Sequence, residues 1–291
     1  MSLPSPHLRR GLSAFDVYNA SMNGIFLVDA RPVAEVDETG RPAGAEGVAE
    51  RPWELPDDPR RAVVLVREGD SAALALALER LAEYSSVVDI GICDAPFAVF
   101  AARFPFAVYG GPGPSASVPG MPCMPAAISD GVWLGAAMHA ERPAVLAALG
   151  VRRVVCVMDD PGGCIPGGAV PVQRWPWVDS PRCDISGDLD AVAAAIEEGR
   201  REGGGGVLVH CFQGKSRSAA AVLAWMIATA RGADRGGEEE AHAGVVVDTL
   251  HAQLQRHRAI VQVNDGFLAQ LKMWAGARRH GGGAAAVATE T

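Results

Sequence analysis

The segment that most restricts the fold of this chain is a short apolar run that ends in a glycine-containing loop and continues into a helix. Its sequence is Val207-Leu-Val-His-Cys-Phe-Gln-Gly-Lys-Ser-Arg-Ser218, followed by a run of small apolar residues. The apolar run predicts a buried strand that ends at His210, and the residues after it predict a helix that starts near Ser218. A strand, a tight loop and a helix in this order are typical of α/β layers.

The same alternation of strands and helices continues through both halves of the chain. Short apolar runs predict strands at 25–28, 63–66, 87–90, 132–134, 154–157 and 207–209. Helical patterns occur at 72–82, 143–149, 190–201, from 218, at 245–260 and at 266–277. The 291 residues correspond to about two domains. We therefore predict an α/β fold of two domains, each with a mostly parallel central sheet flanked by helices.

Clusters of glycine, proline and serine set the expected boundaries of these domains. The stretch from Tyr109 to Pro125 has the composition of a linker, and the final residues, GGGAAAVATET, are of low complexity. We predict a first domain over 1–110, a linker over 111–124, a second domain over 125–278 and a disordered tail over 279–291. Residues 231–244 are expected to form a mobile acidic loop.

Charge and composition exclude several classes of function. The 26 basic and 34 acidic residues give a net charge of −8, which argues against general binding to nucleic acid or to anionic membranes. The apolar run from Ala219 to Ala230 is shorter than the roughly 20 residues that span a bilayer, and the first residues lack a secretory signal. The six cysteines show no zinc-like spacing, so we expect no metal and no cofactor. We expect these thiols to stay free, which favours a reducing compartment, the cytoplasm or the nucleus, as the location of the protein.

The loop after the predicted strand has the composition of an anion-binding cradle. Its backbone N–H groups are expected to converge on a bound anion, together with the positive end of the following helix. Gly214 permits a backbone conformation that a side chain would obstruct, and the Arg217 guanidinium can hold two phosphate oxygens at once. The predicted phosphate-binding residues are Phe212, Gln213, Gly214, Lys215, Ser216 and Arg217.

Cys211 lies at the bottom of this predicted cradle. Donors that attract a phosphate dianion also stabilise a thiolate, so we expect the pKa of Cys211 to fall below that of a free thiol. A thiolate there would attack phosphorus and form a thiophosphoryl intermediate. Asp179, 32 residues upstream in a proline-flanked loop, is the predicted general acid and then base. Ser218 is expected to donate a hydrogen bond to the sulfur as it leaves.

For the residues around this predicted site, the sequence supports more limited predictions. Asp184 competes with Asp179 for the acid role but has the position of a helix-entry residue. His210 is expected to bond the loop backbone, and Asn264 to start a helix and affect the loop indirectly. Lys215 either contacts substrate or is solvated. The tryptophans at 175 and 177 either form a pocket wall or, more commonly for aromatic residues, pack in the core.

The pattern His-Cys-x5-Arg-Ser matches the signature of the cysteine-based protein phosphatases, and residues 124–277 resemble the dual-specificity phosphatase domain. The supporting stretches are Val132-Trp-Leu-Gly135, Asp179-Ser-Pro with Asp184-Ile185, and Val263-Asn-Asp-Gly-Phe-Leu-Ala-Gln-Leu271. The resemblance implies Cys211 as nucleophile, Arg217 as phosphate binder and Asp179 as acid. It also implies metal-independent hydrolysis of phosphotyrosine and phosphoserine/threonine in phosphoproteins. The stretch 156–160 departs from the family, and its two acids are expected to perturb support of the loop.

The first half resembles a rhodanese-like domain. The matching stretches are Leu27-Val-Asp-Ala-Arg31, residues 63–71 and residues 97–106. Such a domain often precedes the catalytic domain in phosphatases of mitogen-activated kinases, which makes such a kinase a candidate substrate. Val66 stands where active sulfurtransferases have cysteine, so we expect docking or packing rather than sulfur transfer. Arg60-Arg61 resembles a kinase-docking segment, but we favour an ordinary strand entrance.

Two other functions compete with protein phosphatase activity. One is a catalytically weak scaffold that binds phosphoproteins, which the unusual 156–160 stretch favours. The other is hydrolysis of a non-protein substrate, such as a phosphoinositide or a phosphorylated glucan, for which Lys215 would be suited. A sulfurtransferase is the weakest interpretation.

Overall fold

The computed structural model divides into two compact units, Met1–Cys123 and Met124–Thr291, which are called unit 1 and unit 2 below. The residues that the structure describes are 7–22, 26–32, 35–36, 41–42, 45–47, 61–66, 70–83, 87, 89–93, 95–104, 108–109, 124–159, 170–202, 206–230 and 239–281.

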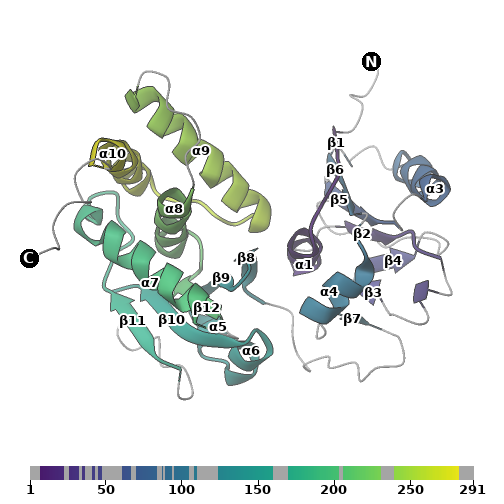
Figure 1. Cartoon of the computed structure of the whole chain (residues 1–291), viewed down its shortest axis with the longest axis horizontal. Coiled ribbons are helices and arrows are strands. Elements are labelled where there is room, and N and C mark those ends of the chain that lie inside the picture. The colour runs from purple at the N-terminus through teal and green to yellow at the C-terminus, as the bar shows by residue number, and fades with distance from the viewer. Residues whose placement is uncertain are drawn as a thin grey trace, which may run out of the picture. The chain divides into compact units, whose positions relative to one another are not determined.

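Unit 1 is built on a parallel sheet with the strand order β1-β6-β5-β2-β4 (Figure 1). Its elements are β1 (His7–Arg9), α1 (Ala14–Met22), β2 (Phe26–Asp29), β3 (Arg41–Pro42), β4 (Ala45–Gly47), β5 (Arg61–Leu65), α3 (Ser71–Leu81), β6 (Asp89–Cys93), α4 (Phe97–Arg103) and β7 (Val108–Tyr109). Apolar side chains of β5, β6 and α3 form one buried cluster. The predicted α/β organisation of this half is therefore present in the described residues.

Unit 2 contains a second sheet with the order β11-β10-β12-β9-β8, in which only the edge strand β8 runs antiparallel. Its elements are β8 (Ala126–Ser129), β9 (Val132–Ala136), α5 (Ala137–Ala140), α6 (Pro143–Ala148), β10 (Val151–Val157), β11 (Val172–Trp175), η2 (Ser186–Asp188), α7 (Leu189–Arg201), β12 (Gly206–Cys211), α8 (Arg217–Thr229), α9 (Glu239–His257) and α10 (Asp265–Gly281). The predicted mostly parallel sheet is confirmed for this unit.

Strand β12 and helix α8 form the centre of unit 2 because both are apolar on every side. All six residues of β12 are buried, as are the residues of α8 from Ser218 to Met226. A strand covered on both faces has a continuous apolar sequence, and a helix that is apolar all round lies inside the protein. Helix α8 packs against α7, α9 and α10, as Figure 1 shows. The loop between β12 and α8 is thus held by buried elements at both ends.

Several predicted boundaries differ from the structure. The helix predicted from 245 begins earlier, at Glu239, and ends at His257. Helix α10 continues to Gly281, so the first residues of the predicted tail are helical. The predicted linker lies outside the described residues except for Met124, and so do residues 231–238 of the acidic loop and residues 282–291 of the tail.

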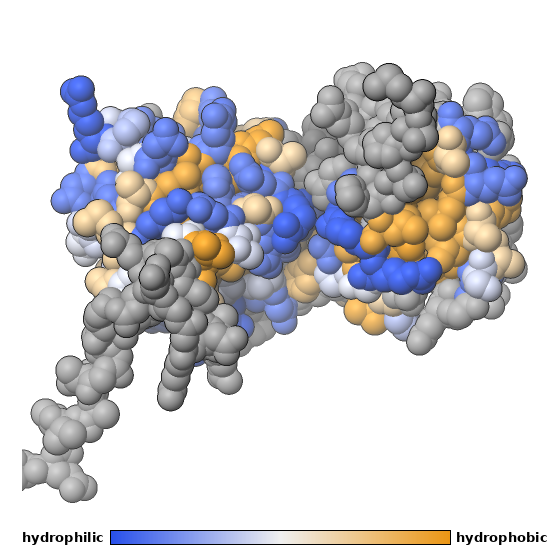
Figure 2. All heavy atoms as spheres, turned by 90° about the horizontal axis from the view of Figure 1, so that it is seen from above, coloured by the Kyte–Doolittle hydropathy of each residue, from blue (hydrophilic) through white to orange (hydrophobic). Residues whose placement is uncertain are grey.

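Hydropathy is distributed unevenly over the described surface. Figure 2 shows a broad group of apolar residues on the visible face of unit 1, bordered by hydrophilic ones. Among the described residues of unit 1, the large exposed apolar side chains are Leu8, Leu76 and Val99. Among the helices of the described residues, none has the length and apolarity required to cross a membrane.

Candidate active site

The predicted site residues meet at the carboxyl edge of the unit 2 sheet. Strand β12 ends at Cys211, which pairs with Ala136 at the end of β9. Asp159 follows the end of β10, and Asp179 follows β11. Ligands of open α/β sheets bind beside the carboxyl ends of the strands, so this edge is where a substrate site is expected.

The outer side of the loop is held by a buried arginine that the sequence analysis did not identify. Arg258, next to the end of α9, donates from Nε to the carbonyl of Gly214 at 3.0 Å and from Nη2 to that of Gln213 at 3.2 Å. Its guanidinium is buried, with 7% of the residue exposed. A charge buried in this way must be hydrogen-bonded, and the two loop carbonyls meet that requirement.

Two more loop carbonyls are bonded by backbone groups from neighbouring segments. The N–H of Ala137 donates to the carbonyl of Phe212 at 3.2 Å, and the N–H of Gln262 donates to that of Lys215 at 2.9 Å. The carbonyls from 212 to 215 are therefore all occupied from outside the loop. Because the C=O and N–H of a peptide unit point in opposite directions, this arrangement favours amides that face inward.

Gly214 meets both requirements that make a glycine necessary in this loop. Its φ is +71°, and a Cβ at this position would overlap the carbonyl of Gly135. A side chain here would displace either the loop or strand β9. The role predicted for Gly214 from the sequence agrees with this geometry.

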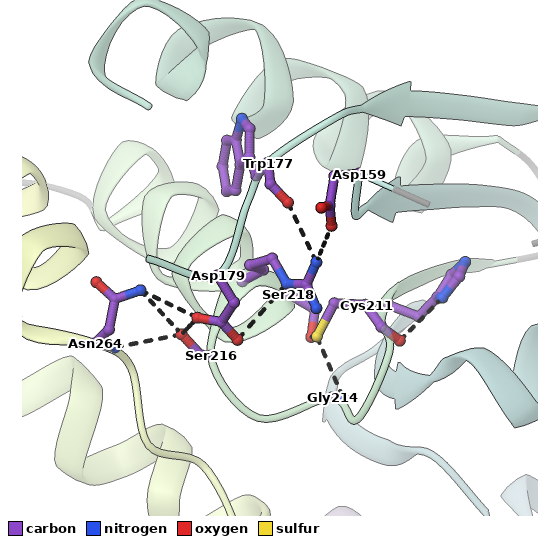
Figure 3. Close-up of polar contacts among 10 residues, drawn as sticks. Asp159, Trp177, Asp179, Cys211, Gly214, Ser216, Ser218 and Asn264 are labelled. Carbon is purple, nitrogen blue, oxygen red and sulfur yellow. Dashed lines mark hydrogen bonds and ion pairs between the residues drawn. The ribbon is translucent and has the colours of Figure 1, made fainter. Parts of the chain in front are cut away.

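The sulfur of Cys211 accepts hydrogen bonds from the loop and from the first turn of α8 (Figure 3). The N–H of Gly214 donates at 3.3 Å and the hydroxyl of Ser218 at 3.2 Å. Burial alone raises the pKa of the Cys211 thiol, but the Ser218 hydroxyl and the amides of Ser218, Lys215 and Gly214 outweigh it and leave the pKa lowered. The site thus favours a thiolate, which is the nucleophilic form of cysteine.

Arg217 is oriented by groups on two neighbouring loops. Its Nη1 donates to Asp159 Oδ1 at 2.7 Å and to the carbonyl of Trp177 at 3.2 Å. Its Nε lies 3.6 Å from Asp179 Oδ2 and has no hydrogen-bond partner among the described residues. One end of the guanidinium is thus anchored, while Nε retains a donor for an anion. Asp159, expected to perturb the loop, instead orients its arginine, and Asp160 lies outside the described residues.

Asp179 connects its own loop to the phosphate loop and to α10, as Figure 3 shows. Its Oδ1 accepts from the hydroxyl of Ser216 at 2.7 Å and from Nδ2 of Asn264 at 3.1 Å. Asn264 also accepts from the N–H of Phe267 at 2.9 Å and so begins α10, as predicted. Its effect is more direct than expected, because it contacts the predicted acid itself.

The competing carboxylate, Asp184, is engaged locally. Its Oδ1 accepts from the hydroxyl of Ser186 at 2.6 Å and from the Ser186 N–H at 2.9 Å, and these two bonds hold the pKa of Asp184 below its usual range. A carboxyl group with a lowered pKa is protonated even less often near neutral pH, so it is less available as a proton donor. The structure therefore places Asp184 at the entry to η2, whereas Asp179, with its Oδ2 3.6 Å from Arg217, stands at the phosphate loop.

The remaining predicted residues have simple positions. His210 is fully buried, and its Nδ1 lies 3.3 Å from the carbonyl of Cys211, so it contacts the loop backbone as expected. Trp177 is a core residue that contacts Phe267, with ring centroids 6.0 Å apart. Phe212 and Gln213 are exposed, and Lys215 is half-buried. The role of the Lys215 ammonium group stays an open prediction.

Removing the Ser218 hydroxyl is expected to shift the titration of the nucleophile. Ser218→Ala deletes the largest of the contributions that lower the pKa of Cys211, so the pKa should rise and the thiol should stay protonated to higher pH. The pH profile of alkylation by iodoacetate measures this shift. Release of the cysteinyl group in the second step should also slow by about tenfold, because a hydrogen bond to a charged group is lost.

Ser129→Ala provides the matched control, because it removes a hydroxyl from β8 in the same unit. It should leave the alkylation profile unchanged. An unchanged profile for Ser218→Ala as well would show that this hydroxyl does not stabilise the thiolate.

Comparisons with known proteins agree with this site. The family model of the dual specificity phosphatase catalytic domain matches residues 132–276. Dual specificity phosphatase 28 of Homo sapiens is 30% identical over 148 residues, which cover 50% of this chain and 75% of that protein. Dual specificity protein phosphatase 12 of Rattus norvegicus is 30% identical over 149 residues. This match covers 50% of the chain but only 40% of the rat protein.

Two solved structures are also similar to the chain. The crystal structure of human DUSP28 shares 28% sequence identity, covers 53% of this chain and 98% of its own, and gives a TM-score of 0.43. The Yvh1 phosphatase domain from Chaetomium thermophilum shares 24% identity over 53% of this chain and 96% of its own, with a TM-score of 0.48.

Proposed function

The chain belongs to the dual specificity phosphatases, and from this membership we propose that it hydrolyses phosphotyrosine and phosphoserine/threonine in proteins through a cysteinyl-phosphate intermediate. The observation that carries the proposal is the environment of Cys211. Its pKa is lowered by donors from the loop and from Ser218, although the residue is almost completely buried. A buried thiolate that is stabilised by donors facing inward has the position that nucleophilic attack on a bound phosphate requires.

In the first step, the Cys211 thiolate attacks phosphorus, so that a P–S bond forms as the P–O ester bond breaks. The leaving oxygen takes a proton from the carboxyl group of Asp179. The loop amides and the Nε of Arg217 stabilise charge on the oxygens that do not leave. Oδ1 of Asp179 already accepts two hydrogen bonds from Ser216 and Asn264, which hold the carboxyl group beside the phosphate loop.

In the second step, water attacks phosphorus and passes a proton to the carboxylate of Asp179. The P–S bond breaks, inorganic phosphate is formed, and the electron pair returns to the sulfur. The Ser218 hydroxyl, 3.2 Å from that sulfur, stabilises the departing thiolate. Nucleophile and acid are then in their starting states, and the proposed cycle needs no metal or cofactor.

We further propose a non-catalytic, rhodanese-like role for the first domain, over residues 1–110. A linker over 111–124 joins it to a catalytic domain that begins at 125 and whose last helix reaches Gly281. The parallel sheet of unit 1 and Val66 immediately after β5 support this assignment. We propose that this domain docks a phosphoprotein such as a mitogen-activated kinase, the partner that the rhodanese-like resemblance implies. A catalytic thiol that must stay reduced favours the cytoplasm or nucleus.

Initial rates on three substrates with a chelator present test the proposed function. The full-length chain should hydrolyse a phosphotyrosine peptide and a phosphothreonine peptide at least about tenfold faster than a soluble phosphoinositide. Phosphate release is the measurement. A preference for the phosphoinositide would overturn the proposed substrate class, and a lack of turnover on all three substrates would overturn the proposed activity.

A further inference from the structure

A glutamine side chain attaches the loop that carries Asp179 to α10. This acid loop, residues 177–185, lies between β11 and η2. Gln270 accepts from the N–H of Ile185 at 2.7 Å through Oε1, and its Nε2 donates to the carbonyl of Cys183 at 2.9 Å. The side-chain amide of Gln270 therefore provides hydrogen-bond partners for one N–H and one C=O of the acid loop, whose backbone is not part of the sheet. Loss of the amide would leave both groups without these partners.

The same helix contacts the acid loop at two other points. A Cβ on Gly266 would overlap the backbone carbonyl of Pro181, so glycine is required for this close approach. The ring of Phe267 packs on Trp177, with the ring planes at 56°. Pro181 follows Asp179 by two residues and Trp177 precedes it by two. Gly266, Phe267 and Gln270 are called the α10 clamp below.

The position of the acid loop determines what the carboxylate of Asp179 can reach. Its Oδ1 is held by Ser216 and Asn264, and its Oδ2 lies 3.6 Å from Nε of Arg217. A proton donor acts only within hydrogen-bond reach of the leaving oxygen, and a displacement of about 1 Å can cost two orders of magnitude in rate. The backbone on both sides of Asp179 must therefore be fixed as firmly as the carboxylate itself.

We propose that Gln270 and Gly266 are positioning residues for proton transfer by Asp179, which hold the acid loop over the phosphate loop from α10. This inference rests on the proposed function, in which Asp179 is the general acid. The two hydrogen bonds of Gln270 reach Ile185 and Cys183, at the opposite end of the acid loop from the Trp177 carbonyl that orients Arg217. Disturbing them should therefore weaken proton donation while leaving nucleophilic attack intact.

Leaving-group dependence distinguishes this role from a purely structural one. A weakly basic phenolate, from a phenol of low pKa, can leave without being protonated. A more basic phenolate must receive a proton as it leaves. Gln270→Met keeps the length of the side chain and removes both hydrogen bonds. We expect kcat/KM to fall about tenfold on phenyl phosphate and less than about twofold on difluoromethylumbelliferyl phosphate. Gln253→Ala on α9 is the matched control and should affect neither substrate.

A double-variant cycle with Asp179→Asn completes the test. If Gln270 acts through Asp179, adding Gln270→Met to Asp179→Asn should cause no further loss on phenyl phosphate. Two results would overturn the proposed role of the clamp. One is an equal fall in kcat/KM on both substrates for Gln270→Met, and the other is a double variant whose fall on phenyl phosphate is the product of the two single effects. Gly266→Ala gives the same readouts if Gln270→Met does not fold. If Asp179→Asn itself lowers kcat/KM equally on both substrates, the acid role of Asp179 in the proposed function fails instead, which is a separate result.

Discussion

Cys211→Ser should lower kcat by about 10⁴-fold or more, because the residue that forms the covalent intermediate is lost. A serine hydroxyl at this position stays protonated at neutral pH, and no neighbouring base is placed to activate it in the described structure. The amides that face the sulfur and the Nε of Arg217 remain in place. Binding of a tetrahedral dianion such as tungstate should therefore survive, or become tighter, because the competing negative charge of the thiolate is gone.

Phosphate release and calorimetric titration with tungstate measure these two effects on the same preparation. Cys93→Ser is the matched control, because it makes the same change at a buried cysteine in unit 1. It should retain full activity. Turnover by Cys211→Ser within about tenfold of the natural chain would refute the covalent mechanism, and loss of tungstate binding would indicate a collapsed loop.

The loop from Cys211 to Arg217 was predictable because the residues that carry its chemistry and those that determine its geometry are consecutive in the sequence. A buried strand, a glycine with positive φ and a helix start determine the path of seven residues locally. Asp179 was predictable only from its type and its proline-flanked surroundings, since it comes from the loop after a different strand. The register between β10, β11 and β12 brings it to the same edge.

Arg258 shows why other parts of the site were missed. It follows a polar helix end, where an arginine is normally solvated, and its carbonyl partners lie 44 and 45 residues upstream. The local sequence pattern around Arg258 gives no indication of a contact with residues so far away in the sequence. The start of α9 at Glu239 was missed as well. The neighbouring glycines and acidic residues favoured a loop instead.

Arg217→Lys should lower kcat/KM by about 10³-fold on every phosphate ester, whatever the leaving group. A lysine keeps the charge but is a point charge, so it cannot hold two phosphate oxygens in one plane. It also loses the Nη1 bonds to Asp159 and to the carbonyl of Trp177, which orient the guanidinium. Steady-state rates on the same two aryl phosphates measure the loss.

The absence of leaving-group dependence separates this effect from that of the α10 clamp. Arg217 stabilises oxygens that remain on phosphorus, whereas Asp179 acts on the oxygen that departs, so only the second effect varies with the basicity of the phenol. Arg174→Lys is the matched control, because Arg174 lies on β11 with its guanidinium on Cys156, outside the phosphate loop. It should leave both rates unchanged. If Arg217→Lys kept more than about a tenth of the activity, transition-state charge would have to be stabilised by the loop amides alone.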